Sequence, residues 1–345
     1  MAQINKPNLN FNPLLYTGNG SYGHAITGVG FQPDWVWIKS RSNTDDSNIY
    51  DAVRGTDKGL SSNTNSAQFT GVNLLGSFNT DGFTVDDHTP INRNGGTIVA
   101  WNWKAGGSGS ANTDGSINTT ATSVNAAAGF SISKYTGTGS NATVGHGLGA
   151  VPSLIIAKNT GGATDWRMYH KGLGNDKSIA INSTGNPGTG SDYWQSTTPT
   201  SSVFSIGTNT GTNSNGDEIV AYCFAEKKGL SKFNFYYGNG NADGPFVYTG
   251  FRPAFVWIKN TQQSGDHWYI WDNKRPGYNV TQKYLGSSRN NAEADSASYA
   301  IDMLSNGFKI KSTTGAINNN GEKLIYIAFA ESALVGTNNI PGVAR

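Results

Sequence analysis

The stretch "GFQPDWVWIK", residues 30–39, decides the fold of this chain because the chain contains three versions of it. The second version is "GAVPSLIIAK" at 149–158 and the third is "GFRPAFVWIK" at 250–259. In each version a tyrosine lies 17 residues before the proline and a lysine six residues after it: Tyr16, Tyr135 and Tyr236, and Lys39, Lys158 and Lys259. One unit of about a hundred residues therefore occurs three times.

Both repeated phrases predict β-strands. In "TIVAWNWKA", 97–105, the large residues Val99, Trp101 and Trp103 alternate with smaller or polar ones, which is typical of a strand with one face on a core. Residues 35–38 are apolar on both faces, as in a strand at the middle of a sheet. Glycine and asparagine turns separate these strands, and no long stretch has a helical period.

These patterns predict an all-β protein of three tandem antiparallel β-sandwiches, with jelly-roll and immunoglobulin-like topologies both open. We expect the second and third sandwiches, joined only by residues 227–233, to form a more rigid pair. The predicted parts are an N-terminal attachment arm at 1–13, sandwiches at 14–106, 129–228 and 229–335, a flexible Gly/Ser/Asn/Thr-rich linker at 107–128, and a C-terminal tail at 336–345.

Composition excludes several classes of protein. The net charge is +2 and only 14% of residues are charged, so no basic field favours nucleic acid. The sequence has no run of 18 apolar residues and no recognisable signal peptide, so we expect no membrane insertion and synthesis in a cytoplasm. The single cysteine, Cys223, excludes an internal disulfide, and the five scattered histidines favour no metal site.

Groups for catalysis are also scarce. The five glutamates mostly flank the last repeated strand, and the pairs Asp45-Asp46 and Asp86-Asp87 are sequence neighbours whose side chains point apart on an extended segment. We therefore predict that the chain is not an enzyme and carries no cofactor.

Aromatic residues are abundant, at 11% of the chain with nine tryptophans. Those that recur in register are predicted to form the repeat core: Trp35, Trp37, Trp103, Tyr222, Phe224, Trp257 and Phe329. Three others, Trp194, Trp268 and Tyr278, have no bulky counterpart in every copy and lie in polar surroundings. They are the candidates for binding a ligand at the surface, since an aromatic face can stack on a sugar ring.

Long phrases of the chain, among them "INKPNLNFNPLLYTGNGS", "ATVGHGLGAVPSLIIAKN" and "DGPFVYTGFRPAFVWIK", resemble a repeat family of virion structural proteins in tailed bacteriophages, especially those of marine bacteria and cyanobacteria. The resemblance extends from about residue 4 to residue 331. It implies a short fibre, knob or capsid decoration on the virion surface, made in the host cytoplasm and released by lysis.

The same resemblance implies other virion proteins as partners, a homo-oligomer that we expect to be a trimer, and a host surface glycan as a further partner. Two alternatives stay open at this point. The chain could be a dedicated receptor-binding tail protein that recognises host polysaccharide, or a polysaccharide depolymerase.

Overall fold

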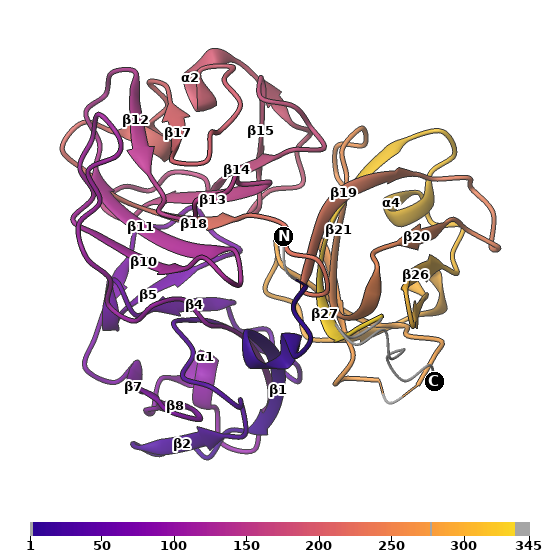
Figure 1. Cartoon of the computed structure of the whole chain (residues 1–345). Coiled ribbons are helices and arrows are strands. Elements are labelled where there is room, and N and C mark those ends of the chain that lie inside the picture. Colours follow the sequence, from indigo (N-terminus) through magenta and orange to yellow (C-terminus); the bar gives the residue numbers. More distant parts are fainter. Residues whose placement is uncertain (1–2, 277, 335–345) are drawn as a thin grey trace.

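The computed structural model describes residues 3–276 and 278–334, and this part of the chain is all-β with a few single-turn helices (Figure 1). It forms three sandwich units, each with a large and a small antiparallel sheet. We call them repeat 1 (β1–β9), repeat 2 (β10–β18) and repeat 3 (β19–β27). The predicted fold class is therefore confirmed, and the C-terminal tail expected at 336–345 lies outside the described residues.

Repeat 1 sets the pattern. Its large sheet has the order β1-β9-β3-β4-β5-β6 and its small sheet the order β2-β8-β7. Four consecutive strands thus lie in one sheet, unlike the four-plus-three arrangement of an immunoglobulin constant domain. Its elements are η1 (Pro7–Leu9), β1 (Phe11–Thr17), β2 (His24–Thr27), β3 (Trp35–Ser40), β4 (Asn48–Asp51), β5 (Gly55–Ser61), β6 (Phe69–Thr70), β7 (Leu75–Asn79), β8 (Gly82–Val85), α1 (Thr89–Asn92) and β9 (Thr97–Trp103).

Repeat 2 adds an edge strand, β10, to the same plan. Its large sheet has the order β10-β11-β18-β13-β14-β15-β16, and β12 pairs with β17 in the small one. Its elements are β10 (Ala121–Asn125), β11 (Phe130–Thr136), β12 (Ala142–Gly145), β13 (Leu154–Asn159), β14 (Arg167–His170), β15 (Lys177–Ala180), β16 (Gly188–Thr189), α2 (Ser191–Trp194), β17 (Val203–Ile206), α3 (Thr210–Asn213) and β18 (Glu218–Phe224).

Repeat 3 returns to the plan of repeat 1, with sheets β19-β27-β21-β22-β23-β24 and β20-β26-β25. Its elements are β19 (Ser231–Tyr237), β20 (Phe246–Tyr248), β21 (Phe251–Asn260), β22 (Tyr269–Asp272), β23 (Lys283–Gly286), β24 (Ala294–Asp295), η2 (Ala297–Tyr299), β25 (Ile301–Leu304), β26 (Gly307–Ile310), α4 (Gly315–Asn318) and β27 (Lys323–Ala333).

The recurring tyrosine holds the first strand of each repeat to a single-turn helix. Its hydroxyl donates to a backbone carbonyl in α1, α3 or α4: Tyr16 to Ile91 at 2.6 Å, Tyr135 to Thr212 at 2.7 Å, and Tyr236 to Ile317 at 2.7 Å. A buried asparagine ends each of these helices, and its amide bonds to the turn that follows the tyrosine: Asn92, Asn213 and Asn318. Buried polar groups are stable here because they are paired.

The central strand β3 is apolar on both faces because it separates two cores. Val36 and Ile38 pack with β8 and β9 residues in a core that belongs to repeat 1 alone. Trp35 and Trp37 point the opposite way, as alternate residues of a strand must, and they join a core that contains side chains from all three repeats. Repeats 2 and 3 also have private cores of their own.

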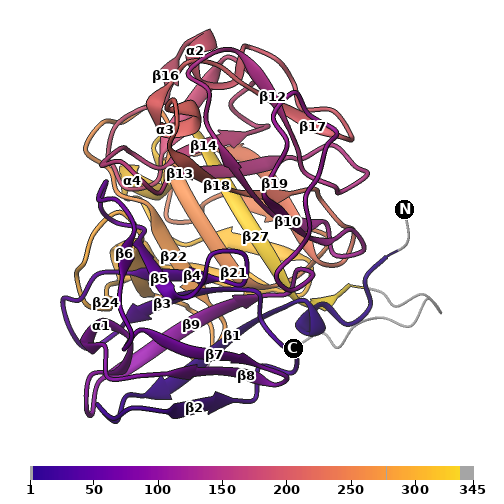
Figure 2. The ribbon, with the colours of Figure 1, turned by 90° about the vertical axis from the view of Figure 1, so that its left-hand side faces the viewer.

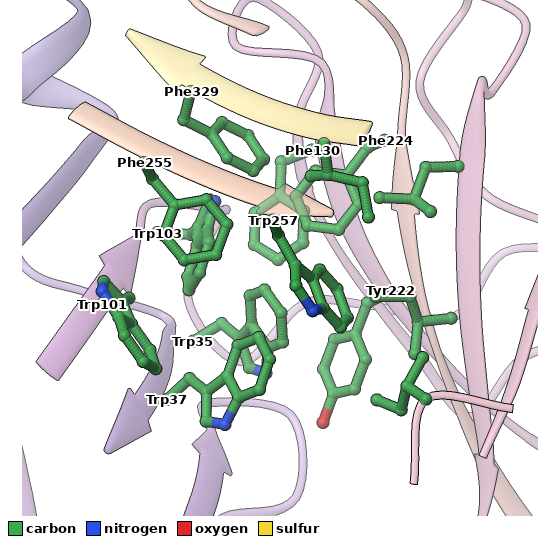
Figure 3. Close-up of a cluster of buried hydrophobic side chains, with 14 of the residues drawn as sticks. Trp35, Trp37, Trp101, Trp103, Phe130, Tyr222, Phe224, Phe255, Trp257 and Phe329 are labelled. Carbon is green, nitrogen blue, oxygen red and sulfur yellow. The ribbon is translucent and has the colours of Figure 1, made fainter. Parts of the chain in front are cut away.

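The shared core brings the inner faces of the three large sheets together (Figure 3). Every pair of repeats meets there through aromatic rings. The ring centroids of Trp35 and Tyr222 lie 4.7 Å apart, those of Trp37 and Trp257 5.2 Å, and those of Phe224 and Phe329 5.6 Å. All seven residues that the sequence predicts for the repeat core are buried in this cluster. Three lobes therefore surround one common centre (Figure 1).

Two expectations need correction: one about the segment before repeat 2, and one about how repeats 2 and 3 pair. The segment predicted as a flexible linker, 107–128, contains β10, which pairs along its length with β11 and buries Ser123. Its small polar residues fold because they bond to neighbouring backbone: Ser123 Oγ, for example, accepts from the amide of Gly106 at 2.8 Å. Repeat 2 also meets repeat 1 in the shared core, where the ring centroids of Trp35 and Tyr222 lie 4.7 Å apart, so the second and third repeats do not form a pair separate from the first.

The predicted attachment arm, 1–13, is in its described part attached to the body of the protein. Residues Phe11 to Pro13 already belong to β1, and the Phe11 ring stacks on Phe329 of repeat 3 at 4.8 Å. The amide of Ile4 donates to the carbonyl of Lys228 at 2.9 Å, and η1 lies against β27 (Figure 2). The apolar residues of this segment thus hold repeat 1 to repeat 3.

Candidate functional site

The three interfaces between repeats use the same strand ends in a cyclic order. Each recurring lysine continues the inward face of its central strand, and its Nζ donates to a backbone carbonyl of the preceding neighbour in the ring. Lys39 reaches Asn290 of repeat 3 at 2.7 Å, Lys158 reaches Asn65 of repeat 1 at 3.4 Å, and Lys259 reaches Thr184 of repeat 2 at 3.4 Å. The ring of repeats is therefore closed within one chain.

These lysines are buried cations that bond mainly to carbonyl oxygens. Lys158 also donates to the carbonyls of Asn159 at 2.7 Å and Gly162 at 3.1 Å, so its three N–H groups all have acceptors. Burial lowers the pKa of each lysine from its usual value to about 8, while a nearby carboxylate, Asp45, Asp165 or Asp266, acts in the opposite direction. Carbonyl solvation of this kind makes the lysine a structural group at the interface.

A second cyclic contact starts from the last residue of β4, β14 and β22. Asp51 is bound by Arg54 at 2.6 Å and accepts a hydrogen bond from the Tyr222 hydroxyl of repeat 2 at 2.7 Å. Asp272 is bound by Arg275 at 2.7 Å and accepts from the Trp101 indole N–H of repeat 1 at 3.0 Å. Both ion pairs are fully buried, and removing one partner of such a pair is strongly destabilising.

Repeat 2 places a histidine at the same position. His170 accepts the Gly172 amide at Nδ1 at 3.1 Å, so its Nε2 carries the proton and donates to the Tyr326 carbonyl of repeat 3 at 3.2 Å. Burial lowers the pKa of His170 to about 3, which keeps it neutral. Sequence reasoning missed these three residues, although the spacing Asp-x-x-Arg, present at 51–54 and 272–275, is a signal that could have found two of them.

The interface between repeats 3 and 1 also has an ion pair at its edge. Arg41 donates to both carboxylate oxygens of Glu293 at 3.0 Å each, and Arg275 lies 3.3 Å from the same carboxylate. The amide of Glu293 donates to the Arg41 carbonyl at 2.8 Å. Two-pronged arginine–carboxylate pairs fix orientation as well as distance, so this pair orients the first repeat against the last.

A groove of about 370 Å³ opens at the outer side of the interface between repeats 2 and 3. Repeat 2 contributes Leu173, Lys177 and Asn186 to it, and repeat 3 contributes Tyr237 and Lys323. The Lys323 ammonium lies 4.1 Å from the ring centroid of Phe235 and donates to the Gly172 carbonyl. This is an amphipathic hollow with two cations at its wall.

Two of the three predicted ligand-binding residues are not at the surface, so this part of the prediction is wrong. Trp194 ends α2 and is buried in the private core of repeat 2, with its ring 6.1 Å from that of Tyr169. Trp268 is buried in the shared core against Trp257, at 4.7 Å, and donates its indole N–H to the Ala180 carbonyl of repeat 2 at 3.0 Å. Both side chains are large apolar groups that find cores despite their polar sequence neighbours.

Tyr278 is the candidate that lies outside the cores. Its side chain is 89% exposed and lines a hollow of about 290 Å³ together with Arg252, Asn273 and Met303. The three predicted residues are therefore not brought together at one site.

The family match covers all three repeats at once. A family model described as a domain of unknown function, DUF7483, matches residues 6–333. The chain belongs to the DUF7483 family. A search of curated proteins finds no match. The match thus spans the whole three-repeat body of this chain.

Of the aspartates considered for catalysis in this DUF7483 member, Asp45, Asp46 and Asp86 have structural partners. Asp45 is bound by Arg93 at 2.5 Å, and Asp86 accepts the Gly23 amide at 2.9 Å. Within residues 3–276 and 278–334, no three or more His, Cys, Asp or Glu side chains form a group that could hold a metal ion. Cys223 is buried, and burial raises the pKa of its thiol. No helix in this same part of the chain has the length and apolar character needed to cross a membrane.

Proposed function

We propose that the chain is a non-enzymatic surface protein of a tailed-phage particle, a knob, short fibre or capsid decoration that displays three β-sandwiches as one rigid body. The observation that carries the proposal is the cyclic closure of the repeats: the lysine contacts and the shared aromatic core tie each repeat to both others. A body whose three sandwiches are already joined within one chain is suited to display on a particle surface outside a cell. The resemblance of its long phrases to virion repeat proteins supports the proposed location on the particle.

Other virion proteins are the proposed partners, and the homotrimer implied by the resemblance is part of the proposal. One chain of 36.6 kDa already places three sandwiches around one centre. Light scattering of the purified protein decides between one chain and three, because three chains have a mass of about three times that value. A measured mass of three chains favours the short fibre or knob, and a mass of one chain favours a capsid decoration that acts as a monomer.

Immunogold labelling of intact purified particles tests the location. The proposal predicts specific label on the particle, with particles that lack the protein as the control. Label at the tail favours attachment to the host, and label over the head favours decoration. Protein that is abundant in the lysate but absent from washed particles contradicts the proposal.

A second candidate function, a tail protein that recognises host polysaccharide, is supported by the groove between repeats 2 and 3. An exposed tyrosine and two lysines line a hollow of about 370 Å³ there. Its test is a binding measurement, described below.

A further inference from the structure

The three interfaces allow the grooves at their outer sides to be compared position by position. Strand register makes Lys323 of repeat 3 equivalent to Glu218 of repeat 2 and Thr97 of repeat 1. The same register makes Phe235 equivalent to Lys134 and Leu15, and makes Tyr237 equivalent to Thr136 and Thr17.

At the equivalent positions of repeat 2, the two charged side chains pair with each other. Lys134 and Glu218 form an ion pair there at 3.0 Å. At the corresponding place between repeats 3 and 1, the side chains are the short Leu15 and Thr97. Among these three sets of equivalent positions, a cation beside an aromatic ring therefore occurs in repeat 3, with Lys323 over Phe235.

The chemistry of this groove favours an anion that carries a ring. Tyr237 is 58% exposed and lines the hollow, so one face of its ring is available for stacking. Lys323 lies over the neighbouring Phe235 ring, and Lys177 stands on the opposite wall beside the carboxylate of Asp176, at 3.1 Å. Asn186 and Gln262 also line the hollow; the Gln262 side-chain oxygen accepts the Lys323 backbone amide at 2.6 Å, and its NH₂ group can donate to a hydroxyl group.

The two lysines influence each other. Burial lowers the pKa of Lys323, and the charge of Lys177 lowers it further. Two ammonium groups that repel across a hollow gain from an anion placed between them. No carboxylate lines this hollow in the described part of the chain, although Asp176 lies next to Lys177.

We propose that the groove between repeats 2 and 3 binds an anionic saccharide, with a pyranose ring against Tyr237 and its carboxylate or sulfate group between Lys177 and Lys323. This inference deepens, and in its biological meaning rests on, the proposed host-surface role. The saccharide is held by stacking and charge together, so a neutral sugar of the same ring size binds far more weakly.

The test measures binding of the full chain to three pentasaccharides by isothermal titration calorimetry: an oligogalacturonate, a sulfated galactan fragment and neutral maltopentaose. We expect at least one anionic probe to bind at least tenfold more tightly than maltopentaose, and the affinity to fall as sodium chloride is raised from 50 to 500 mM. The two anionic probes distinguish carboxylate from sulfate.

Matched variants locate the site. Tyr237→Ala and Lys323→Thr, the latter installing the repeat 1 residue, are each expected to weaken binding at least tenfold. Tyr22→Ala removes a tyrosine of similar exposed fraction, 62%, in repeat 1, and Lys283→Ala removes the repeat 3 counterpart of Lys177; both should bind within twofold of the parent.

Melting temperatures of all four variants verify that they fold. Failure of both anionic probes to bind, equal binding of maltopentaose, or equal loss in the control variants overturns the groove proposal. None of these results bears on particle labelling, so the two proposals fail separately.

Discussion

Replacing Trp35 with alanine tests whether the three repeats unfold as one body. Trp35 is buried in the shared core, where its ring contacts Trp103 of its own repeat at 4.3 Å and Tyr222 of repeat 2 at 4.7 Å. Burial of about 200 Å² at about 25 cal/mol/Å² is worth about 5 kcal/mol. Measured truncations of buried Trp or Phe cost about 3–5 kcal/mol, so we expect a loss near 4 kcal/mol.

The shift in melting temperature depends on how much chain unfolds with Trp35. The unfolding entropy near 60 °C is about 2.1 cal/mol/K per residue, or about 0.7 kcal/mol/K for 345 residues. One cooperative body therefore melts only about 5–6 °C lower in the variant. A single repeat of about 100 residues has an entropy near 0.2 kcal/mol/K, and its melting temperature falls by about 20 °C.

Differential scanning calorimetry separates the two cases. We expect one endotherm in both proteins, displaced by about 5–6 °C, and no displacement for Val72→Ala, whose side chain is 86% exposed in repeat 1. A transition that splits off and moves by about 20 °C while the rest stays in place refutes the shared-core argument.

Two further predictions concern the buried polar groups. Tyr222→Phe removes the hydrogen bond to the Asp51 carboxylate and should lower the free energy of unfolding, measured in urea, by about 1.5–3 kcal/mol. The control Tyr50→Phe removes a buried hydroxyl that has no hydrogen-bond partner in the described chain, so it should change the free energy of unfolding very little. Equal losses in the two variants contradict the assignment. The free energy of unfolding should rise between pH 8 and about 9.5 because of the recurring lysines Lys39, Lys158 and Lys259. In the folded protein their pKa values are lowered to about 8, so they lose protons over this range. In the unfolded chain the same lysines keep their protons up to their usual pKa near 10.5. The slope reaches at most about 1.4 kcal/mol per pH unit for each lysine, and Lys259→Met should reduce it; a flat urea stability across this range opposes the prediction.

The recurring phrases made the strands and the three sandwiches predictable, because strand alternation depends on local sequence. They also contained a hint of the shared core, since residues 35–38 are apolar on both faces. The sequence alone could not predict which residues pack against the second face of this strand. The covering groups, such as Tyr222 over Trp35, come from other repeats more than a hundred residues away.

The candidate site was harder to predict because the interfaces are equivalent in geometry and different in residue type. Trp268 has a serine, Ser47, as its repeat 1 counterpart, which made it resemble a surface residue although it fills an interface. The groove residue Tyr237 immediately follows the recurring Tyr236, and only the strand register shows that one is inside and the other outside. A residue that differs among the three copies can therefore be either a buried interface residue, as Trp268 is, or an exposed one, as Tyr237 is.

Small-angle X-ray scattering of the purified chain tests the central claim, that three repeats close into one body, most directly. A compact body of 345 residues has a radius of gyration of about 20 Å. Three separate sandwiches of about 13 Å each, strung about 35 Å apart in a line, give about 30 Å. The closed ring predicts a single value near 20 Å, and a value near 30 Å contradicts it.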